Sequence, residues 1–405
     1  MRTDRPLLVW TLALISTAGY GALYYAQPLL GVATEHALGW SRVQTSLAFT
    51  LALLTNAALA PLVGHQLDRF GGRSLISGGA LLGAAALFEM SLTTNYPAFV
   101  LCWLLAGVAM TLTFYEAVFT VVSQQFQGAT RTRATLSVTL IAGLASTVFV
   151  PLTTVFLGRG GLATALQGLA GVLLVVAIVG AFVLPKTSGA SLVRSRPVSA
   201  PFVPDQAFQR LSLTFTLARI VSVGVGLQLA PLLLSRGESP AVAAGLAGLM
   251  GLAALPGRLL FVPLMNRLGV QRLTVGLILG LGLGPLLLIL HSTPLAALGI
   301  AVFGLANGAL TLARSELLMS RYRAEQFGSV NGRLAFPVNL AQALTPYGVG
   351  LLFTWTQGYT TSLLFLGGAA AMAAVVFLAV GSQVSLPARP DEHGVERALA
   401  KMHKG

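Results

Sequence analysis

The sequence predicts an all-α membrane protein in which twelve transmembrane helices form two related six-helix bundles. The first observation is composition, because 55% of the 405 residues are hydrophobic and only 9% are charged. Soluble domains have about 45–50% apolar and about 25% charged residues, so this chain has too little polar surface to solvate a globule. The other two observations are a series of apolar segments, each long enough to cross a bilayer, and a weak internal repeat.

Twelve segments reach the length of about 20 residues that a membrane-spanning helix needs. The first, which starts at Leu7, is too long for the short apolar core of a signal peptide, so we expect an uncleaved helix. In chain order, the expected helices cover residues 7–31, 43–66, 74–93, 98–122, 134–157, 162–184, 211–234, 241–264, 273–291, 295–318, 334–355 and 361–380.

The longest expected loop, residues 185–210, is rich in Pro, Ser and Arg. We predict that it is a cytoplasmic linker between an N-terminal bundle, residues 1–184, and a C-terminal bundle with a short tail, residues 211–405.

The positive charges are distributed asymmetrically. Of the 25 Lys and Arg residues, 19 fall in segments on the side of the two termini, three on the opposite side and three inside helices. The positive-inside rule therefore predicts a multi-pass protein of the cell membrane with both termini in the cytoplasm. Because the net charge of +13 is explained by topology, the lipid bilayer is the expected partner and nucleic acid is not.

The two bundles also repeat weakly in sequence. Shifted by 198 residues, the segment 68–71 (DRFG) aligns with 266–269 (NRLG). Shifted by 200 residues, Glu116 aligns with Glu316 and Gly128 aligns with Gly328. Several landmarks in register indicate one duplicated six-helix unit, related by an axis along the membrane normal. Glu316 itself is expected to be a structural carboxylate near the membrane interface.

The turn between the second and third expected helices reads GHQLDRFGGR over residues 64–73. Its spacing, G-x-x-x-D-R-x-G-x-R, resembles the corresponding loop of the major facilitator superfamily, whose members contain two six-helix bundles. The resemblance implies transport by alternating access. It also implies that Asp68 bonds the start of helix 11, near residues 333–336, and a basic residue after helix 4. The implied conformational switch comprises Gly64, Asp68, Arg69, Gly71, Arg73, Arg131 and Arg133.

Polar side chains follow one face of helices 1, 4, 7 and 10 at steps of three and four residues. Four such stripes, on every third helix, predict a water-filled central cavity. The alternative for any single hydroxyl is that it only bonds a neighbouring helix. Helices 6, 9 and 12 are nearly free of polar residues and are expected to face lipid. Helix 3 is similar apart from Glu89 near its outer end, where water is close. The stripes contain Ser16, Tyr20, Tyr24 and Gln27; Thr113, Glu116, Thr120 and Ser123; Ser212, Thr216, Arg219 and Ser222; Asn307, Thr311 and Arg314.

Apart from Glu89 and Glu316, which are close to helix ends, four charged residues fall inside expected helices: Glu116, Arg219, Arg258 and Arg314. An ionised side chain at mid-bilayer costs about 2.5–3.5 kcal/mol on insertion scales, so it needs a partner or a function. Three arginines against one glutamate favour a small anionic substrate, because the guanidinium group matches a carboxylate. The alternatives are that the arginines extend to the cytoplasmic interface, and that Glu116 either pairs with an arginine or carries a coupling proton. The expected substrate-binding residues are Tyr20, Tyr24, Gln27, Glu116, Arg219, Arg258, Asn307 and Arg314.

Residues 39–73 also resemble bacterial relatives of the monocarboxylate porters and oxalate/formate antiporters. Gly257-Arg258 resembles the position of the substrate-binding arginine of that branch. The oxalate-type family also uses a lysine in helix 11, whereas residues 334–355 contain no Lys or Arg. The resemblance therefore implies a monocarboxylate or another small organic anion, with Arg219 or Arg314 as a second cation. The alternative is a multidrug exporter, for which we would expect a larger, aromatic-lined cavity with acidic residues.

No catalytic constellation is visible in the sequence. The five histidines have no metal-ligand spacing, and no phosphate-binding loop for ATP is present. The single cysteine, Cys102, excludes an internal disulfide. We therefore expect a monomeric secondary transporter for a small-molecule substrate, not an enzyme, with no cofactor and with proton coupling left open. A receptor or scaffold would need an appended domain, and the tail after residue 381 is expected to be too short for one.

Overall fold

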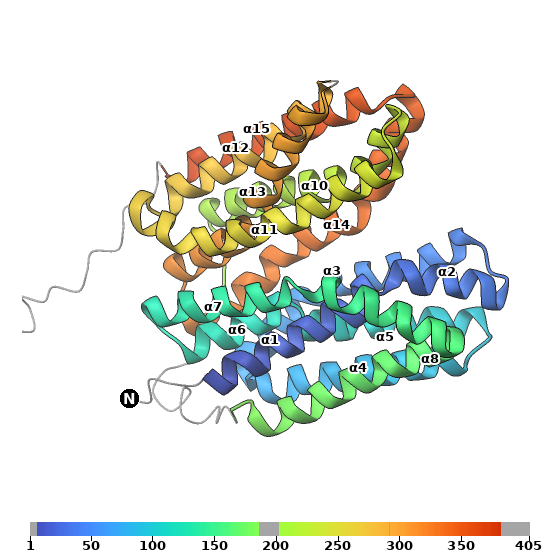
Figure 1. Cartoon of the computed structure of the whole chain (residues 1–405). Helices are drawn as coiled ribbons and strands as arrows, with labels where there is room; N and C mark the ends of the chain where they lie inside the picture. The colour runs from blue at the N-terminus through green and yellow to red at the C-terminus, as the bar shows by residue number, and fades with distance from the viewer. Residues whose placement is uncertain (1–5, 186–201, 291, 382–405) are drawn as a thin grey trace, which may run out of the picture.

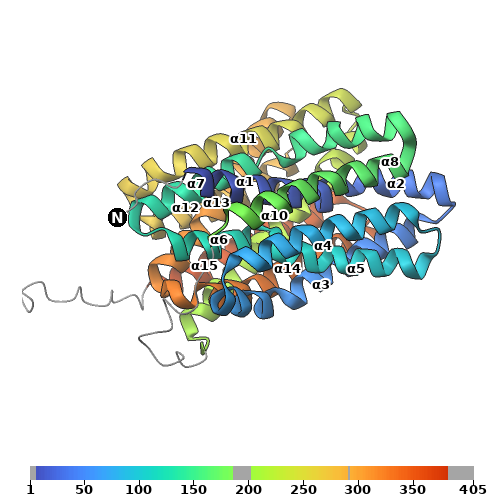
Figure 2. The ribbon, with the colours of Figure 1, turned by 90° about the horizontal axis from the view of Figure 1, so that it is seen from below.

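The computed structural model describes residues 6–185, 202–290 and 292–381, and these residues form helices and turns without a β-strand. Figure 1 shows two groups of helices that lie side by side, α1 to α8 in blue and green and α10 to α15 in yellow-green to red. In both groups the helices run roughly along one common direction, as Figure 2 shows from below. The predicted all-α membrane fold is confirmed.

Several membrane passes of the N-terminal half consist of more than one helical piece. α1 continues through the π-helical turn η1 into α2, and α5 is separated from α6 by one extended residue, Phe114. α7 and α8 are separated by Gly143 and Leu144. The bounds are α1 Pro6–Tyr20, η1 Gly21–Tyr25, α2 Gln27–Leu38, α3 Arg42–Phe70, α4 Gly72–Leu92, α5 Tyr96–Thr113, α6 Tyr115–Gln125, α7 Gly128–Ala142 and α8 Ala145–Val183.

The long helix α8 contains the end of the pass that begins with α7 and the whole of the next pass, because the chain turns at Gly160 and Gly161. Gly160 has φ −164° and ψ 24°, and Gly161 has φ 69° and ψ −159°. The positive φ of Gly161 is a conformation that glycine adopts without the steric cost of a Cβ. The turn lies between residues 157 and 162, where the fifth and sixth helices were expected to meet.

The passes of the C-terminal half are formed by longer uninterrupted helices. Asp205 and Ser239 cap α10 and α11, because each side chain accepts a hydrogen bond from the N–H group three residues later. The bounds are α10 Gln206–Ser235, α11 Pro240–Leu268, α12 Val270–Ile289, α13 Thr293–Arg321, η2 Ala324–Gln326, α14 Phe327–Thr356 and α15 Tyr359–Gly381. α10 begins before the expected residue 211, and α14 begins before the expected residue 334. The prediction relied on runs of apolar residues, and such runs do not include the polar residues at the start of a helix.

Ten described helical stretches are long and apolar enough to cross a membrane. One of them, Gly128–Val183, includes the turn at Gly160 and Gly161 and so makes two passes. α14 has sufficient length but is not among the ten, and it carries Asn331, Asn339 and Gln342. Each of the twelve predicted segments thus corresponds to a described helix. The domain boundaries stay a prediction, and most of the expected linker, residues 186–201, lies outside the described residues.

The helices expected to face lipid carry many of the exposed large apolar side chains. Examples are Val175 and Phe182 on the second pass of α8, Leu279 on α12, and Leu364 and Val375 on α15. These side chains cover the outside of the molecule and leave the polar residues for its centre.

The two halves approach most closely where α3 meets α14. A Cβ atom on Gly64 would lie 2.0 Å from the carbonyl oxygen of Gly328, and one on Gly332 would lie 2.3 Å from that of Ala60. Only glycine permits such backbone contact. These contacts lie at the end of the molecule that holds the α3–α4 turn at Gly71, which we call the Asp68 end.

Candidate functional site

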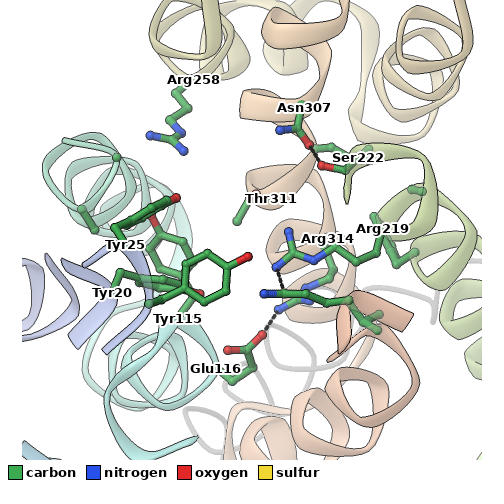
Figure 3. Close-up of a pocket in the computed structure, with 18 residues that line it drawn as sticks. Tyr20, Tyr25, Tyr115, Glu116, Arg219, Ser222, Arg258, Asn307, Thr311 and Arg314 are labelled. Atoms are coloured by element: carbon green, nitrogen blue, oxygen red, sulfur yellow. Dashed lines mark hydrogen bonds and ion pairs between the residues drawn. The ribbon is translucent and has the colours of Figure 1, made fainter. Parts of the chain in front are cut away.

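A cavity of about 190 Å³ lies between the two halves. Figure 3 shows Tyr20, Tyr25, Tyr115 and Glu116 to the left of it and below, and Arg258, Asn307, Ser222, Arg219 and Arg314 above it and to the right. The first group comes from α1, η1 and α6, and the second comes from α10, α11 and α13. The cavity is lined by Tyr20, Tyr24, Tyr25, Tyr115, Glu116, Ala142, Gly143, Phe215, Ala218, Arg219, Ser222, Arg258, Asn307, Leu310, Thr311, Arg314, Val338 and Gln342.

Most of the expected substrate-binding residues line this one cavity. They are Tyr20, Tyr24, Glu116, Arg219, Arg258, Asn307 and Arg314. Gln27 does not, because it lies at the start of α2, beyond the π-helical turn η1. The sequence pattern assumed a constant helical period, whereas a π-helical turn holds more residues per turn and rotates everything after it. The same rotation brings Tyr25 to the cavity, which the pattern missed.

Glu116 and Arg314 form an ion pair across the cavity. Arg314 Nη2 lies 2.9 Å from Glu116 Oε1, and the two side chains are only 10% and 14% exposed. Asn331 donates a hydrogen bond to the backbone carbonyl oxygen of Glu116 at 3.2 Å. Glu116 is also in the first turn of α6, where the helix dipole favours a negative charge. Of the two roles expected for Glu116, the structure shows the pairing with an arginine.

Arg219 and Arg258 contact only neutral acceptors in the described part of the chain. Arg219 Nη2 donates to the side-chain oxygen of Gln342. Arg258 Nη1 donates to the backbone oxygen of Thr139 at 3.0 Å. The Nε atoms of both arginines are buried without an acceptor. Two guanidinium groups therefore face the cavity without a carboxylate partner among the described residues.

Gly143 makes the position of Arg258 possible. A Cβ atom on Gly143 would lie 1.6 Å from Arg258 Nη1, so any larger residue would displace the guanidinium group. Gly143 is also the residue that ends α7, and its N–H group and Arg258 Nη1 both donate to the carbonyl oxygen of Thr139. The position of a C-terminal arginine thus depends on the end of an N-terminal helix.

The wall opposite the arginines is aromatic. The rings of Tyr20 and Phe114 stack with centroids 3.9 Å apart, and Tyr20 also contacts Tyr115 at 4.8 Å. Tyr115 adjoins Glu116 in sequence, but the interruption at Phe114 that turns both toward the cavity has no proline or glycine to reveal it. On the opposite side, Ser222 donates to Asn307 Oδ1 at 2.6 Å. Gln342, the partner of Arg219, was detectable only as a polar residue in an apolar segment.

The expected switch residue Asp68 bonds the start of α14. Its carboxylate accepts hydrogen bonds from the N–H groups of Gly328 at 2.8 Å and Ser329 at 2.6 Å, and from the Ser329 hydroxyl at 2.7 Å. The contact was expected near residues 333–336, and it lies at 328–329 because α14 begins earlier than expected. Gly64 provides the close approach of α3 to Gly328, and Gly71 ends α3 with φ 77°.

The basic switch residues do not pair with Asp68. In the described part of the chain neither Arg131 nor Arg133 forms an ion pair, so the expected pairing is wrong for this conformation. Arg133 is exposed and lines a surface groove beside Trp10. Arg69 lies over the ring of Phe70, 5.1 Å from its centroid, and Arg73 is the second residue of α4.

Glu316 joins the halves at a second point. The hydroxyl group of Thr132 on α7 donates to Glu316 Oε2 at 3.0 Å. Glu116 and Glu316 are equivalent in the repeat, so each half contacts the other half through the carboxylate at this repeat position. This agrees with the structural role expected for Glu316.

A twelve-pass helical fold with a polar central cavity between two halves defines a membrane transporter. A family model described as Major Facilitator Superfamily matches residues 9–238, and the chain belongs to this superfamily. It is therefore a transporter and not an enzyme.

Relatives of this chain are distant. It is 31% identical over 99 residues to the multidrug resistance protein MdtH of Aeromonas hydrophila, and the match spans 24% of this chain and about a quarter (25%) of that protein. The monocarboxylate branch stays a prediction.

Solved structures resemble the whole fold at low identity. A bacterial homologue of the iron transporter ferroportin in its outward-facing state matches with a TM-score of 0.77 and 15% identity over 94% of this chain and 100% of that one. The human organic anion transporter MFSD10 matches with a TM-score of 0.76 and 16% identity, over 92% of this chain and 98% of that one. The proton:xylose symporter XylE matches with a TM-score of 0.69 and 13% identity, over 93% of this chain and 96% of that one. At such identities the likeness shows the fold alone.

Proposed function

We propose that this protein is a secondary transporter that moves a small organic anion through the central cavity by alternating access. The observation that carries the proposal is the pair Arg219 and Arg258, whose guanidinium groups reach the cavity without a carboxylate partner among the described residues. Glu116 is the acid that lines the cavity, and its charge is already paired with Arg314.

Electrostatics favours an anion in this cavity. A positive charge in the membrane interior costs several kcal/mol unless a partner or water compensates for it. A carboxylate substrate would supply that partner, and the planar guanidinium group can bind it through two parallel hydrogen bonds. A cavity of about 190 Å³ suits a small solute, because drug-sized ligands occupy pockets of about 300–1,000 Å³.

Alternating access is supported by the contacts between the halves. Asp68 with Gly328 and Ser329, and Thr132 with Glu316, join the halves at the Asp68 end. We propose that the Asp68 end is cytoplasmic, in agreement with the distribution of Lys and Arg. The structure would then represent a conformation closed toward the cytoplasm.

The finer proposal is a monocarboxylate or similar anion. Arg258 occupies the position implied by the resemblance to the monocarboxylate porters, and no Lys or Arg lies in residues 334–355. Because Arg314 is neutralised by Glu116, Arg219 is the better candidate for the second cation. Glu116 remains a candidate for proton coupling, since its protonation would release Arg314.

Multidrug efflux is the second candidate, and two observations favour it. The wall formed by Tyr20, Tyr25 and Tyr115 could bind flat apolar compounds. The relative MdtH is described as a multidrug resistance protein, although the match covers a quarter of it.

A ligand-stabilisation screen on the purified protein separates the two candidates. We expect small carboxylates to raise the melting temperature and cationic amphiphiles to have no such effect. Arg258→Gln and Arg219→Gln should each weaken carboxylate binding about 10- to 100-fold, since hydrogen bonds to charged groups are worth about 1.5–3 kcal/mol. Arg236→Gln, in the turn after α10 and outside the cavity lining, is the matched control. A cation as the best ligand, or normal binding by both variants, would make drug export the leading function.

A further inference from the structure

A groove of about 570 Å³ runs between α4 and α8, on the outside of the N-terminal half and away from the central cavity. α4 contributes Arg73, Ser77, Gly78 and Leu81, and α8 contributes small and aliphatic side chains such as Ala177. Figures 1 and 2 show these two helices next to each other. No carboxylate is among the residues that line the groove, so its only full charge is that of Arg73.

One end of the groove favours a negative group. Arg73 is the second residue of α4, and the helix begins directly after Gly71, whose φ is 77° and which offers no capping side chain. The N–H groups of the first helical turn therefore lack a side-chain cap and carry the positive end of the helix dipole. An anionic group next to Arg73 would satisfy both the guanidinium group and these N–H groups.

Ser77 lies at the base of the groove, one helical turn from Arg73, and is only 7% exposed. Its Oγ atom faces α8 and not the groove, because a Cβ atom on Gly180 would lie 2.8 Å from it. Ser77 therefore closes the base of the groove, and the charge of Arg73 is what attracts a ligand.

The rest of the groove has the dimensions of a lipid chain. From Arg73 to Leu81, α4 rises about 12 Å at about 1.5 Å per residue. One leaflet of hydrocarbon is about 15 Å thick, half of the bilayer core. The space above Gly78 is open, because a Cβ atom there would meet nothing within 4 Å. Exposed Leu81 and Ile178 form an apolar rim.

We propose that this groove binds one anionic phospholipid of the surrounding bilayer. The phosphate group lies at Arg73 and the N-terminus of α4, and an acyl chain lies over Gly78 against α8. The groove opens at the Asp68 end, the end with most of the basic residues, where anionic lipids of the cytoplasmic leaflet would be available.

The test compares lipids on the purified full-length protein in neutral detergent. We expect phosphatidylglycerol to raise the melting temperature and to remain bound in native mass spectrometry, unlike phosphatidylcholine with the same acyl chains. Glycerol 3-phosphate and inorganic phosphate should not replace it, because they lack the chain. Arg73→Gln should weaken retention of phosphatidylglycerol about fivefold, since a basic residue near the membrane surface is worth about 1 kcal/mol of attraction to anionic lipid. Gly78→Leu fills the open space and should also reduce retention.

The C-terminal half provides matched controls. Arg272 and Gly276 occupy almost the same repeat positions on α12 as Arg73 and Gly78 on α4, and a Cβ atom on Gly276 would also meet nothing within 4 Å. Arg272→Gln and Gly276→Leu should leave retention unchanged. Melting without added lipid confirms that each variant is folded. Equal retention of both lipids, equal binding of free phosphate, or an equal loss in the controls would overturn the proposal.

Discussion

The two halves of this transporter share a weak sequence repeat, yet they surround the cavity in different ways. In the N-terminal half, the chain is interrupted beside the cavity at η1, at Phe114 and at Gly143–Leu144. In the C-terminal half, α10, α11 and α13 pass the cavity as uninterrupted helices. The first half contributes aromatic rings and a carboxylate, and the second contributes three arginines.

The two halves contribute differently to the charged groups of the cavity. The interruption before α6 places Glu116 in a first helical turn, where it pairs with Arg314. At the end of α7, the Thr139 carbonyl group and Gly143, which has no Cβ atom, lie beside Arg258. The N-terminal half therefore positions the cations that the C-terminal half supplies, and the substrate would meet both halves at once.

The largest expected effect comes from removing Arg314 from its pair with Glu116. Arg314→Gln leaves a buried carboxylate without its partner, which costs about 3–5 kcal/mol in buried pairs. We expect a strongly lowered melting temperature of the purified protein. The double variant Arg314→Gln with Glu116→Gln should recover much of this loss, because neither side chain is then charged. Equal destabilisation of the single and double variants would contradict the importance of the pair across the halves.

A smaller effect is expected from adding a methyl group at Gly143. This residue belongs to the N-terminal half, and its new side chain would displace Arg258 of the C-terminal half. Gly143→Ala should weaken binding of a carboxylate ligand about tenfold, similar to the loss of one charged hydrogen bond of about 1.5 kcal/mol. The backbone of Gly143, with φ −65° and ψ −18°, is accessible to alanine, so the protein should fold. Gly171→Ala, where a Cβ atom would meet nothing within 4 Å, is the control. Unchanged affinity of Gly143→Ala would show that Arg258 does not need its contact with α7.

The sequence predicted the fold and most of the cavity because both depend on regular patterns. Apolar length set the helices, and polar steps of three and four residues placed Tyr20, Glu116, Arg219 and Asn307 on the cavity side. The same regularity explains the errors. Because of the π-helical turn η1, Tyr25 lines the cavity and the predicted Gln27 does not. The interruption between α5 and α6 lies at Phe114, which is neither proline nor glycine and so gives no signal in the sequence. The partners of Asp68 depend on how two distant helices meet, which no local pattern specifies.

The contact of Asp68 distinguishes the two halves at the Asp68 end, because the equivalent residue in the repeat is Asn266. Asp68→Asn keeps the shape but removes the charge at the start of α14, which is worth about 0.3–1 kcal/mol at a helix N-terminus. We expect slower transport and a shifted conformational balance, while substrate binding stays measurable. Asn266→Ala is the control and should transport normally. If Asp68→Asn also transports at the normal rate, the turn serves only as a polar connection.

A small effect on stability alone is expected at a contact in the C-terminal half that has no charged counterpart at the end of α6. Burial alone would raise the pKa of Asp205. Its hydrogen bonds from the Phe208 N–H group, Arg321 and Tyr322 outweigh burial, so the pKa lies below its ordinary value. A depressed pKa means that the carboxylate stabilises the fold above its unfolded pKa of about 3.9. This stabilisation is lost as the pH falls through the folded pKa.

Asp205→Ala should therefore lower the melting temperature slightly at pH 7, by the roughly 1 kcal/mol of a lost N-cap. The carboxylate is half exposed, with 49% of its side chain accessible, so its ion pair with Arg321 should add little. The difference between the wild type and the variant should shrink below about pH 4 and approach zero in stronger acid. A difference that stays constant from pH 7 to pH 3 would mean that Asp205 acts through packing rather than through its charge. In that case neither half would depend on a charged group for stability at these helix ends.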